Sequence, residues 1–466
     1  MIRKKLNILS INQSDQRGGA AAVAWNLFNG YIQRGHQSSL VVDYKFSDHP
    51  NVIKVENPLH YNSWTRWVRS IQSQIRKAYV YKKGAWRLLE MLDWVANPAI
   101  KFRNKYGIEE FNFPGSRNIF NSTTKKPDLI HTHNLHGGYF DLRLLATLSQ
   151  TFPVFLTLHD AWMLSGHCAH SFECERWKTG CGNCPDLTIP KAIKYDNSAL
   201  NWKRKHEIYK KSKLYISTPC QWLMDKVNAS ILREGCVESK VIPYGIDHSI
   251  FFPSDSLISR QNLGIEHDST VLLFSANGIK RNRWKDFAMM KKALEKIGSY
   301  SWSKKIVFLA LGEQAPSEFF GQVELRFVPY RSDKKSVADF YRAADIYLHA
   351  AKADTFPNAV LEALSCGTPV LGTAVGGIPE QVKGYDKFLD ENACNRYPED
   401  KATGILSSSG DVESFVEMLV FLIENDSTRK KMGVNAAIDA KVRFPIERQV
   451  SDYLDWYQSV LRNKTE

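Results

Sequence analysis

The stretch "LNILSINQSDQRGGAAAVAWNLFNGYIQRGHQSSLVVDY", residues 6–44, sets the expectation for the fold. Its apolar run at 6–12 predicts a strand, and the loop "QSDQRGG" follows. Residues 20–35 then carry apolar side chains at helical spacing, and residues 38–44 predict a second strand. Strand, helix and strand in this order form the repeating unit of a doubly wound α/β sheet.

The same rhythm continues along most of the chain. Short apolar runs that end in polar residues or Gly fit buried parallel strands. In the first half they lie at 128–134, 154–160, 213–219 and 239–245, and in the second half at 269–277, 305–312, 323–329, 345–351 and 368–374.

We therefore expect an α/β chain of two doubly wound, Rossmann-like domains, at 1–248 and 249–443, joined by a linker near 246–256. Residues 444–466 are expected to add a closing amphipathic helix. Two such domains facing each other would form a cleft, and ligands bind at the carboxyl ends of the strands.

Composition narrows the class of protein. The chain has 466 residues, of which 43% are hydrophobic and 24% charged, an ordinary globular mixture. A net charge of +13 favours an anionic partner: nucleic acid, anionic lipid or a phosphorylated small molecule. We see no run long enough for a transmembrane helix and no signal peptide, so we expect a cytoplasmic protein.

Residues 58–106 break the α/β rhythm with a basic, aromatic insert. It holds ten Lys and Arg against two acids, with tryptophans interleaved at 64, 67, 86 and 94. We expect a pair of helices here. They could simply be solvated, but Trp mixed with Lys and Arg also suits an anionic membrane surface. Nucleic-acid binding would need a groove-reading element, and the segment shows none.

The most informative stretch for chemistry is "AAKADTFPNAVLEALSCGTPVLGTAVGGIPEQV", residues 350–382. Asp354 ends a strand, Pro357 sits near a helix start, and Glu362 follows eight residues after Asp354. Gly376 and Gly377 form a turn that lets backbone N–H groups approach an anion. Two carboxylates so placed could accept hydrogen bonds from sugar hydroxyls, although an ordinary β-α-β unit with surface acids fits equally well.

This stretch resembles the nucleotide-sugar signature of retaining GT-B glycosyltransferases of family 4. The signature is an acid, seven residues and a Glu, followed by Gly-x-Pro-Val, matched here by Gly367, Pro369 and Val370. The resemblance extends to 18–27, 127–134, 156–160, 241–247 and 344–350. Two segments, "HNLHGGYFDL" (133–142) and the cysteine-rich 159–185, are similar to a subgroup of bacterial exopolysaccharide glycosyltransferases of the colanic acid kind.

The resemblance implies roles residue by residue. Gly18 and Gly19 match a glycine loop near the donor phosphate, and His159 matches the histidine that contacts the donor sugar. Lys285, accompanied by Arg283 or by the neighbouring Lys280 or Arg281, matches the pair that neutralises the diphosphate. Asp354 matches the sugar-binding acid and Glu362 the ribose-binding Glu, with Gly376 and Gly377 near the phosphates.

Three departures from the family pattern stand out. Asp354 replaces the usual Glu and reaches about one methylene less far, Tyr244 occupies a position that is often Asn, and Lys285-Asp286 replaces Lys-Gly. Fixed cations and backbone N–H groups can stabilise a leaving diphosphate without a metal, so we expect no catalytic metal. His159 could alternatively be a core histidine.

Half of the eight cysteines fall in one loop, 166–186. Cys168, Cys174, Cys181 and Cys184 have the spacing C-x5-C-x6-C-x2-C, whose last part is typical of half a zinc site. A structural Zn would hold this irregular loop in place, and a reducing compartment favours zinc. The alternatives are two disulfides or four thiols that only pack.

Histidines cluster at 131, 133 and 136, directly before Gly137-Gly138. Their place at a strand end favours acceptor contact by His133 and His136, while a metal site or simple alternation into the core also fits.

The resemblance implies transfer of a sugar from a nucleotide-diphosphate donor to a saccharide or polyprenyl-linked saccharide, with retention, in bacterial surface polysaccharide assembly. Two other classes remain open: a non-catalytic nucleotide- or saccharide-binding relative, and another GT-B enzyme such as a nucleotide-sugar epimerase or a phosphorylase.

Overall fold

The computed structural model describes residues 5–57, 61–79, 85–122, 125–388 and 395–463. It divides into two compact units. The first comprises Met1–Thr218, Leu223–Val241 and Tyr453–Glu466, and the second comprises Pro219–Trp222 and Ile242–Asp452. The chain thus returns to its first unit at the end. The domain limits expected at 248 and 443 stay predictions.

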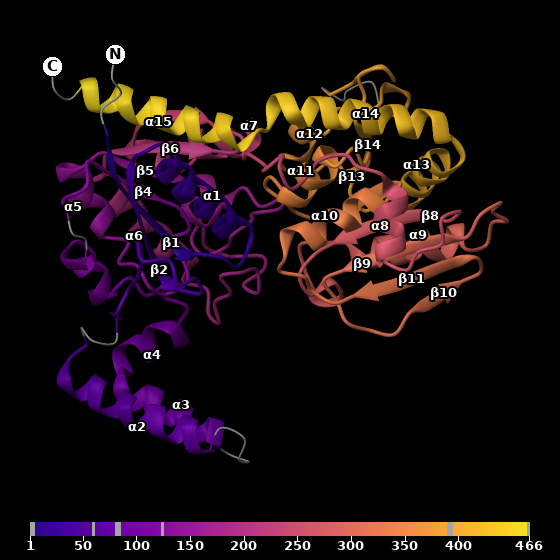
Figure 1. Ribbon diagram of the computed structural model, residues 1–466. Coiled ribbons are helices and arrows are strands. Elements are labelled where there is room, and N and C mark those ends of the chain that lie inside the picture. The colour runs from indigo at the N-terminus through magenta and orange to yellow at the C-terminus, as the bar shows by residue number, and fades with distance from the viewer. Residues whose placement is uncertain (1–4, 58–60, 80–84, 123–124, 389–394, 464–466) are drawn as a thin grey trace. The chain divides into compact units, whose positions relative to one another are not determined.

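The first unit is built on a seven-stranded, wholly parallel sheet in the order β3-β2-β1-β4-β5-β6-β7 (Figure 1). β1, the first strand in sequence, lies inside this sheet and pairs with β2 on one side and β4 on the other. The strands are β1 (Asn7–Ser14), β2 (Gln37–Tyr44), β3 (Val52–Lys54), β4 (Leu129–Thr132), β5 (Val154–Thr157), β6 (Leu214–Thr218) and β7 (Cys236–Val241). All seven carboxyl ends therefore lie at one edge of this sheet.

Helices flank this sheet, and α1 shows why they form. Val23, Leu27 and Tyr31 recur at four-residue spacing on its buried face, so the helix packs on β1 and β2. The helices are α1 (Gly19–Gln33), α5 (Leu144–Thr151), α6 (Ser198–Tyr209) and α7 (Gln221–Asn228), with part of α15 (Ile446–Asn463).

The basic aromatic insert has three described helices where the sequence led us to expect two. They are α2 (Ser63–Tyr79), α3 (Ala85–Ala96) and α4 (Pro98–Lys105). The expectation failed at Asn97-Pro98, because Pro at a first helical position starts α4 directly after α3 ends. Residues 58–60 and 80–84 of the insert lie outside the described part of the chain.

The second unit carries another seven-stranded sheet, in the order β10-β11-β9-β8-β12-β13-β14. It is parallel except for β10, which pairs antiparallel with β11 at the edge. The strands are β8 (Thr270–Ser275), β9 (Ile306–Leu311), β10 (Glu318–Phe320), β11 (Val323–Val328), β12 (Ile346–His349), β13 (Val370–Thr373) and β14 (Gly404–Ser407).

The core of the second unit lies between its sheet and helices. β8, β9 and β12 contribute wholly buried Leu, Ile and Phe side chains, as expected of central parallel strands. The helices are α8 (Ser256–Asn262), α9 (Phe287–Ile297), α10 (Lys334–Ala343), α11 (Asn358–Ser365), α12 (Ile378–Gln381), α13 (Val412–Glu424) and α14 (Asp426–Arg443).

The two Rossmann-like sheets confirm the fold class expected from the sequence. Three strands were not anticipated: β3, β10 and β14. β3 and β10 have only three residues each, too few to show a periodic pattern, and β14 (Gly404–Ser407) is a four-residue run beginning at Gly.

Candidate active site

Asp354 lies in the loop after β12, at the carboxyl edge of the second sheet, and meets a lysine there. Lys285 Nζ donates to Asp354 Oδ2 at 2.5 Å and lies 2.9 Å from His349 Nε2. His349 Nε2 is in turn 3.2 Å from the same carboxylate oxygen. All three side chains are mostly buried. The result is a compact cluster of a cation, a carboxylate and a neutral imidazole.

The segment 282–286 holds Lys285 in place by backbone pairing with the loop after β12. Asp286 N donates to Ala350 O at 3.0 Å, and Lys352 N donates to Trp284 O at 2.9 Å. Asp286 also caps α9, because its Oδ1 accepts from Met289 N at 3.1 Å. The Asp that departs from the family's Lys-Gly therefore has a structural role at the start of a helix.

Arg283 lies on the same segment but is exposed, with its guanidinium 5.9 Å from the ring of Trp284. Lys280 forms an ion pair with Glu318 at 3.5 Å. Of the cations on this segment, Lys285 is the one that the structure places against Asp354. The second cation expected to accompany Lys285 at the diphosphate stays a prediction.

A continuous chain of polar contacts joins the two signature acids. Each link has polar atoms 2.8–3.2 Å apart. The chain runs from Asp354 through His349, Tyr347, Ser275 and Tyr341 to Glu362. β8, α10, β12, α11 and the loop after β12 supply its members, so the packing of the unit fixes both carboxylates together.

The pKa values in this cluster follow from burial and charge. Burial alone would raise the pKa of Asp354, but Lys285 and His349 outweigh it and hold that pKa well below its usual range. Burial, aided by Lys285, lowers the pKa of His349 to about 4. Burial raises the pKa of Glu362. At neutral pH the cluster therefore holds a carboxylate, an ammonium group and a neutral imidazole.

Gly376 and Gly377 pack directly against the signature loop. A Cβ on Gly376, whose φ is +58°, would lie 1.7 Å from Asp354 O. Gly377 N donates to Thr355 O at 2.9 Å, and a Cβ there would lie 2.3 Å from the same oxygen. These glycines thus set the path of the loop that carries Asp354, and their contact with phosphates stays a prediction.

In the first unit, the histidines gather where β4 and β5 end. His133 Nδ1 lies 3.0 Å from His159 Nε2, and the two rings stack. His131 is wholly buried between Thr157 Oγ1 and Tyr457 OH, at 2.7 Å from each, which makes it a core residue. Burial lowers the pKa of His133, and burial lowers that of His159 to about 4, so this pair is neutral at pH 7.

His136 points elsewhere, into a cavity of about 630 Å³. Its Nε2 lies 2.7 Å from Asp160 Oδ2, while its Nδ1 is buried with no hydrogen-bond partner. Burial opposes ionisation of Asp160, but His136 prevails and lowers the pKa of that carboxyl. The structure thus separates the two histidines expected to contact an acceptor: His133 pairs with His159, and His136 lines the cavity.

Gly18 and Gly19 lie exposed at the start of α1, just past the carboxyl end of β1. Gly18 has φ +99°, a conformation that favours glycine, and its carbonyl accepts the first helical hydrogen bond from Ala22 N. The position suits an anion near a helix start, as the resemblance implies.

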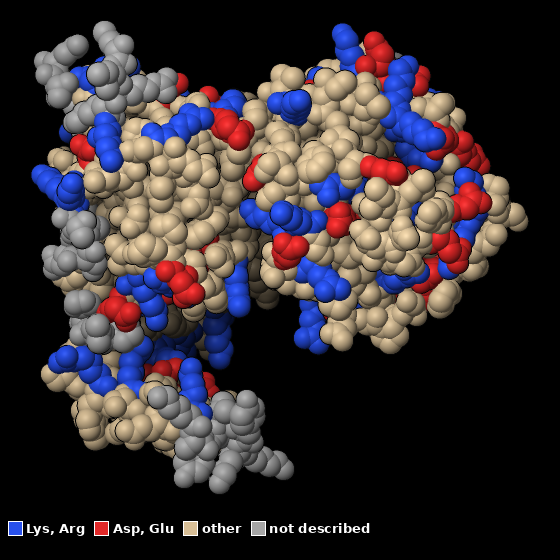
Figure 2. All heavy atoms as spheres, in the orientation of Figure 1, with Lys and Arg blue, Asp and Glu red and all other residues tan. Residues whose placement is uncertain are grey.

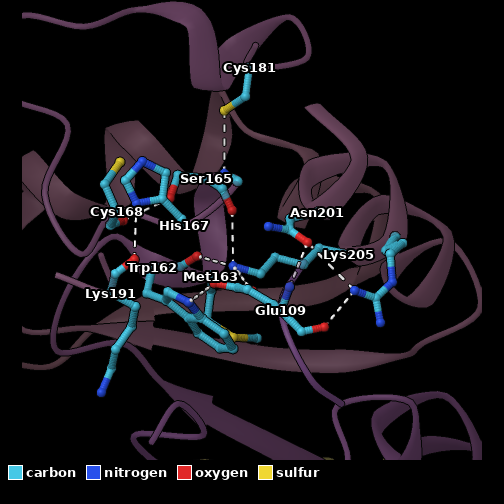
Figure 3. A network of polar contacts seen from close by, with 12 residues as sticks. Glu109, Trp162, Met163, Ser165, His167, Cys168, Cys181, Lys191, Asn201 and Lys205 are labelled. Carbon is cyan, nitrogen blue, oxygen red and sulfur yellow. Dashed lines mark hydrogen bonds and ion pairs between the residues drawn. The ribbon is translucent and has the colours of Figure 1, made fainter. Parts of the chain in front are cut away.

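The start of the cysteine-rich loop is held by a buried lysine (Figure 3). Lys205 Nζ donates to Trp162 O at 2.9 Å and Ser165 O at 3.0 Å, and lies 3.1 Å from Glu109 Oε2. It also sits 3.7 Å from the centre of the Trp162 ring. Lys205 thus supplies an anchor for this loop that the sequence did not reveal.

The four cysteines of the loop are free thiols. Burial raises the pKa of Cys168 and Cys184, and raises that of Cys181 to about 12. Cys184 Sγ is 3.2 Å from His167 Nε2. Within the described ranges, no three His, Cys, Asp or Glu side chains are arranged to hold a metal ion. Zinc at Cys168, Cys174, Cys181 and Cys184 stays a prediction.

Sequence reasoning missed His349 and Tyr341, which connect the two acids. His349 was available as a signal, since it ends an apolar strand five residues before Asp354. Tyr341 gave no signal, because only the packing of α10 against α11 brings it to Glu362.

Comparison with known proteins matches residues 258–439 to the family described as Glycosyl transferases group 1. The chain is 22% identical over 388 residues to a protein of Escherichia coli (strain K12) named for colanic acid biosynthesis, the glycosyl transferase WcaC. That match covers 79% of this chain and 83% of the relative. The chain is also 25% identical to the N-acetyl-alpha-D-glucosaminyl L-malate synthase of Bacillus anthracis. That second match covers 47% of this chain and 53% of the synthase.

Solved structures of similar fold cover almost the whole chain. Sucrose-phosphate synthase from Thermosynechococcus elongatus matches with a TM-score of 0.62 at 15% identity, over 98% of this chain and 100% of that one. Anabaena HepE in complex with UDP-glucose matches with a TM-score of 0.55 at 17% identity, over 97% and 99%. The fold is therefore GT-B, and residues 258–439 match the group 1 glycosyltransferase family.

Proposed function

We propose that the protein transfers a sugar from a nucleotide-diphosphate sugar to a saccharide acceptor, with retention, in the assembly of a bacterial surface polysaccharide. The observation that carries the proposal is the Lys285–Asp354–His349 cluster and its hydrogen-bonded connection to Glu362. It lies within the residues that match the group 1 family. The name of the Escherichia coli relative supports the polysaccharide.

The cluster has the groups that such a transfer needs. Breaking the bond between the sugar and the diphosphate leaves negative charge on the leaving group, which a fixed ammonium such as Lys285 can stabilise. Glu362, held by Tyr341, can accept hydrogen bonds from ribose hydroxyls. Asp354 can do the same for the donor sugar.

Turnover tests this proposal. We expect purified protein, mixed with a saccharide acceptor extract, to release nucleoside diphosphate from one class among UDP-, GDP- and ADP-sugars. Glu362→Gln should lower kcat/KM by about 10²-fold or more, since an acceptor oxygen for the donor's ribose is lost. Glu424→Gln, at an exposed position on α13, is the matched control.

Release of diphosphate with no glycosylated product would indicate epimerase or hydrolase chemistry instead. Binding of a nucleotide sugar with no release would support the non-catalytic relative. NMR of the new linkage decides retention, because an inverted anomeric carbon would contradict that part of the proposal.

We further propose that the insert docks on an anionic membrane surface. Trp64, Trp67, Trp86 and Phe102 expose more than half of their surface, and Arg66, Arg76 and Arg87 are exposed beside them. Figure 2 shows Lys and Arg, with Asp and Glu among them, where the insert meets the rest of the first unit. Aromatic rings beside cations suit the boundary between headgroups and acyl chains. Among the described residues, no helix is long and apolar enough to cross a membrane.

Vesicle sedimentation tests the docking. Trp64→Ala with Trp67→Ala should weaken binding to phosphatidylglycerol vesicles by about tenfold, since two aromatic side chains lose their contact with lipid. Phe319→Ala, which removes an exposed ring from β10, should leave binding unchanged. Equal binding by all three proteins would overturn the docking proposal.

A further inference from the structure

Four arginines surround a second, strongly polar cavity of about 300 Å³ in the first unit. They come from four separate segments: Arg103 from α4, Arg117 from the 3-10 helix Pro114–Ser122, Arg143 from the turn before α5, and Arg204 from α6. Glu110, Phe111 and Asn112 complete the lining. Guanidinium groups that converge on one cavity from distant parts of a chain form a site that favours an anion.

The acids around this cavity balance only part of the charge. Glu110 Oε2 accepts from Arg103 Nε at 2.9 Å and from Arg103 Nη2 at 2.6 Å. Asp141, wholly buried, accepts two hydrogen bonds from Arg143 and one from Arg117. Four guanidinium groups therefore face two carboxylates, an excess of two positive charges.

Arg204 completes the positive wall. Its Nη1 donates to Glu109 O at 2.6 Å, and its guanidinium lies 4.3 Å from the centre of the Phe111 ring. Burial lowers the pKa of Arg204. Glu110 and Glu109 act against that shift, and the neighbouring Arg103 and Arg143 add to it. Arg103 and Arg143 are therefore close enough to Arg204 to repel it, and an anion bound among the three would reduce that repulsion.

The arginine cavity adjoins the large cavity into which His136 points. Glu110 and Phe111 line both. The large cavity has aromatic rings from Tyr61 and Trp162, and hydrogen-bonding groups from Asn57 and His136, which are features suited to a saccharide. A ligand with its sugar in the large cavity would thus have the arginines next to it.

We propose that the arginine cavity binds a phosphate or diphosphate group, and that this group belongs to the acceptor, which is a saccharide carried on a phosphate. The inference deepens the proposed function and rests on it for the identity of the acceptor. Arginine presents paired N–H groups that match phosphate oxygens, and phosphate contacts of this kind are among the stronger hydrogen bonds. The insert contributes to both cavities through Tyr61 and Arg103, so the same insert that carries the exposed tryptophans would receive the acceptor.

Calorimetry with inorganic pyrophosphate at low ionic strength tests the site. The binding should persist in Lys285→Ala, which removes the cation of the second unit. It should weaken about tenfold in Arg117→Gln, and further in Arg103→Gln with Arg117→Gln, because each change removes charged hydrogen bonds. Arg34→Gln, at an exposed position of the same unit, is the control. Arg117 is half exposed and Arg143 still holds Asp141, so the single variant should fold.

Two results would overturn the site: binding that is unchanged in both arginine variants, or binding that disappears in Lys285→Ala. A second arm compares phosphatidylcholine vesicles with and without a polyprenyl diphosphate. We expect the wild type to prefer the vesicles that carry the diphosphate, and Arg117→Gln to lose that preference. Binding of free pyrophosphate without this preference would reject the lipid-carried acceptor.

This experiment also separates the two proposals. Pyrophosphate binding needs no donor and no turnover, so the arginine site can stand if the transfer activity fails. Equally, turnover with an acceptor that has no phosphate would refute the inference and leave the transferase intact.

Discussion

At the scale of the residue, the pair of Lys285 and Asp354 is the feature with the largest consequence. Each side chain is mostly buried, and each depends on the other for a counter-charge. Breaking a buried ion pair from one side leaves an uncompensated charge, which is more costly than removing both partners. The pair is therefore expected to matter for stability as well as for chemistry.

We predict that Lys285→Ala lowers the free energy of unfolding of the second unit by about 3 kcal/mol. The double variant Lys285→Ala with Asp354→Ala should recover part of that loss, because no buried carboxylate is left without a partner. Thermal melting of the four proteins of the double-mutant cycle measures the coupling. Strictly additive effects would show that the two groups do not stabilise each other.

The pH dependence of stability should carry the signature of His349. Its pKa is lowered to about 4 in the folded protein, against an ordinary value near 6.5, so the unfolded chain takes up a proton first as pH falls. Its stabilising effect is present above about pH 6.5 and is lost between there and pH 4.

Between pH 7.5 and pH 5, we expect this one group to remove about 2 kcal/mol from the free energy of unfolding. In His349→Asn the loss over that range should be smaller by this amount, as measured by melting at each pH. Parallel curves for the two proteins would contradict the assignment of a neutral, buried His349.

At the scale of the element, the turn between β13 and α12 fixes the loop that carries Asp354. Gly376 has a backbone conformation that residues with a side chain rarely adopt, and a Cβ at this position would meet the carbonyl oxygen of Asp354. Sequence inspection singled out this glycine turn for its possible approach to phosphate. The structure adds a reason of another kind, which is the close packing of two backbone segments.

We predict that Gly376→Ala destabilises the second unit by about 3 kcal/mol or more, since it adds a collision with the Asp354 carbonyl to the cost of the backbone conformation. Gly410→Ala is the matched control. Gly410 has φ +81° but open space around its Cβ position, so its change should cost only about 1 kcal/mol. Equal melting temperatures for the two variants would contradict the close approach.

At the scale of the whole molecule, the periodic pattern predicts the two sheets without their short strands β3, β10 and β14. Central strands such as β8 and β9 are long, apolar and wholly buried, so their pattern predicts them reliably. The short β3 and β10 have too few residues to show a period. The break between α3 and α4 depended on Pro98, a local signal that a count of basic and aromatic residues overlooks.

The candidate site was predictable only in part. Motif spacing placed Asp354 and Glu362 on one unit, and the structure joins them through side chains that no motif connects. His133 and His136 are three residues apart in sequence, yet one faces His159 and the other a cavity. Spacing along the chain does not determine where these two histidine side chains lie, because that depends on the path of the backbone after β4.

The most direct test of the account is binding of nucleotide sugars, measured by the shift in melting temperature. UDP-, GDP- and ADP-sugars would be added to wild type, Glu362→Gln and Lys285→Ala, with Glu424→Gln and Lys292→Ala as exposed controls. A ligand that binds only the folded state raises the melting temperature.

The account predicts that one class of nucleotide sugar raises the melting temperature of the wild type and of both controls, but raises that of the two site variants much less. If the two site variants respond as the wild type does, or if no nucleotide sugar shifts any of the five proteins, the donor site assigned to Lys285, Asp354 and Glu362 is wrong.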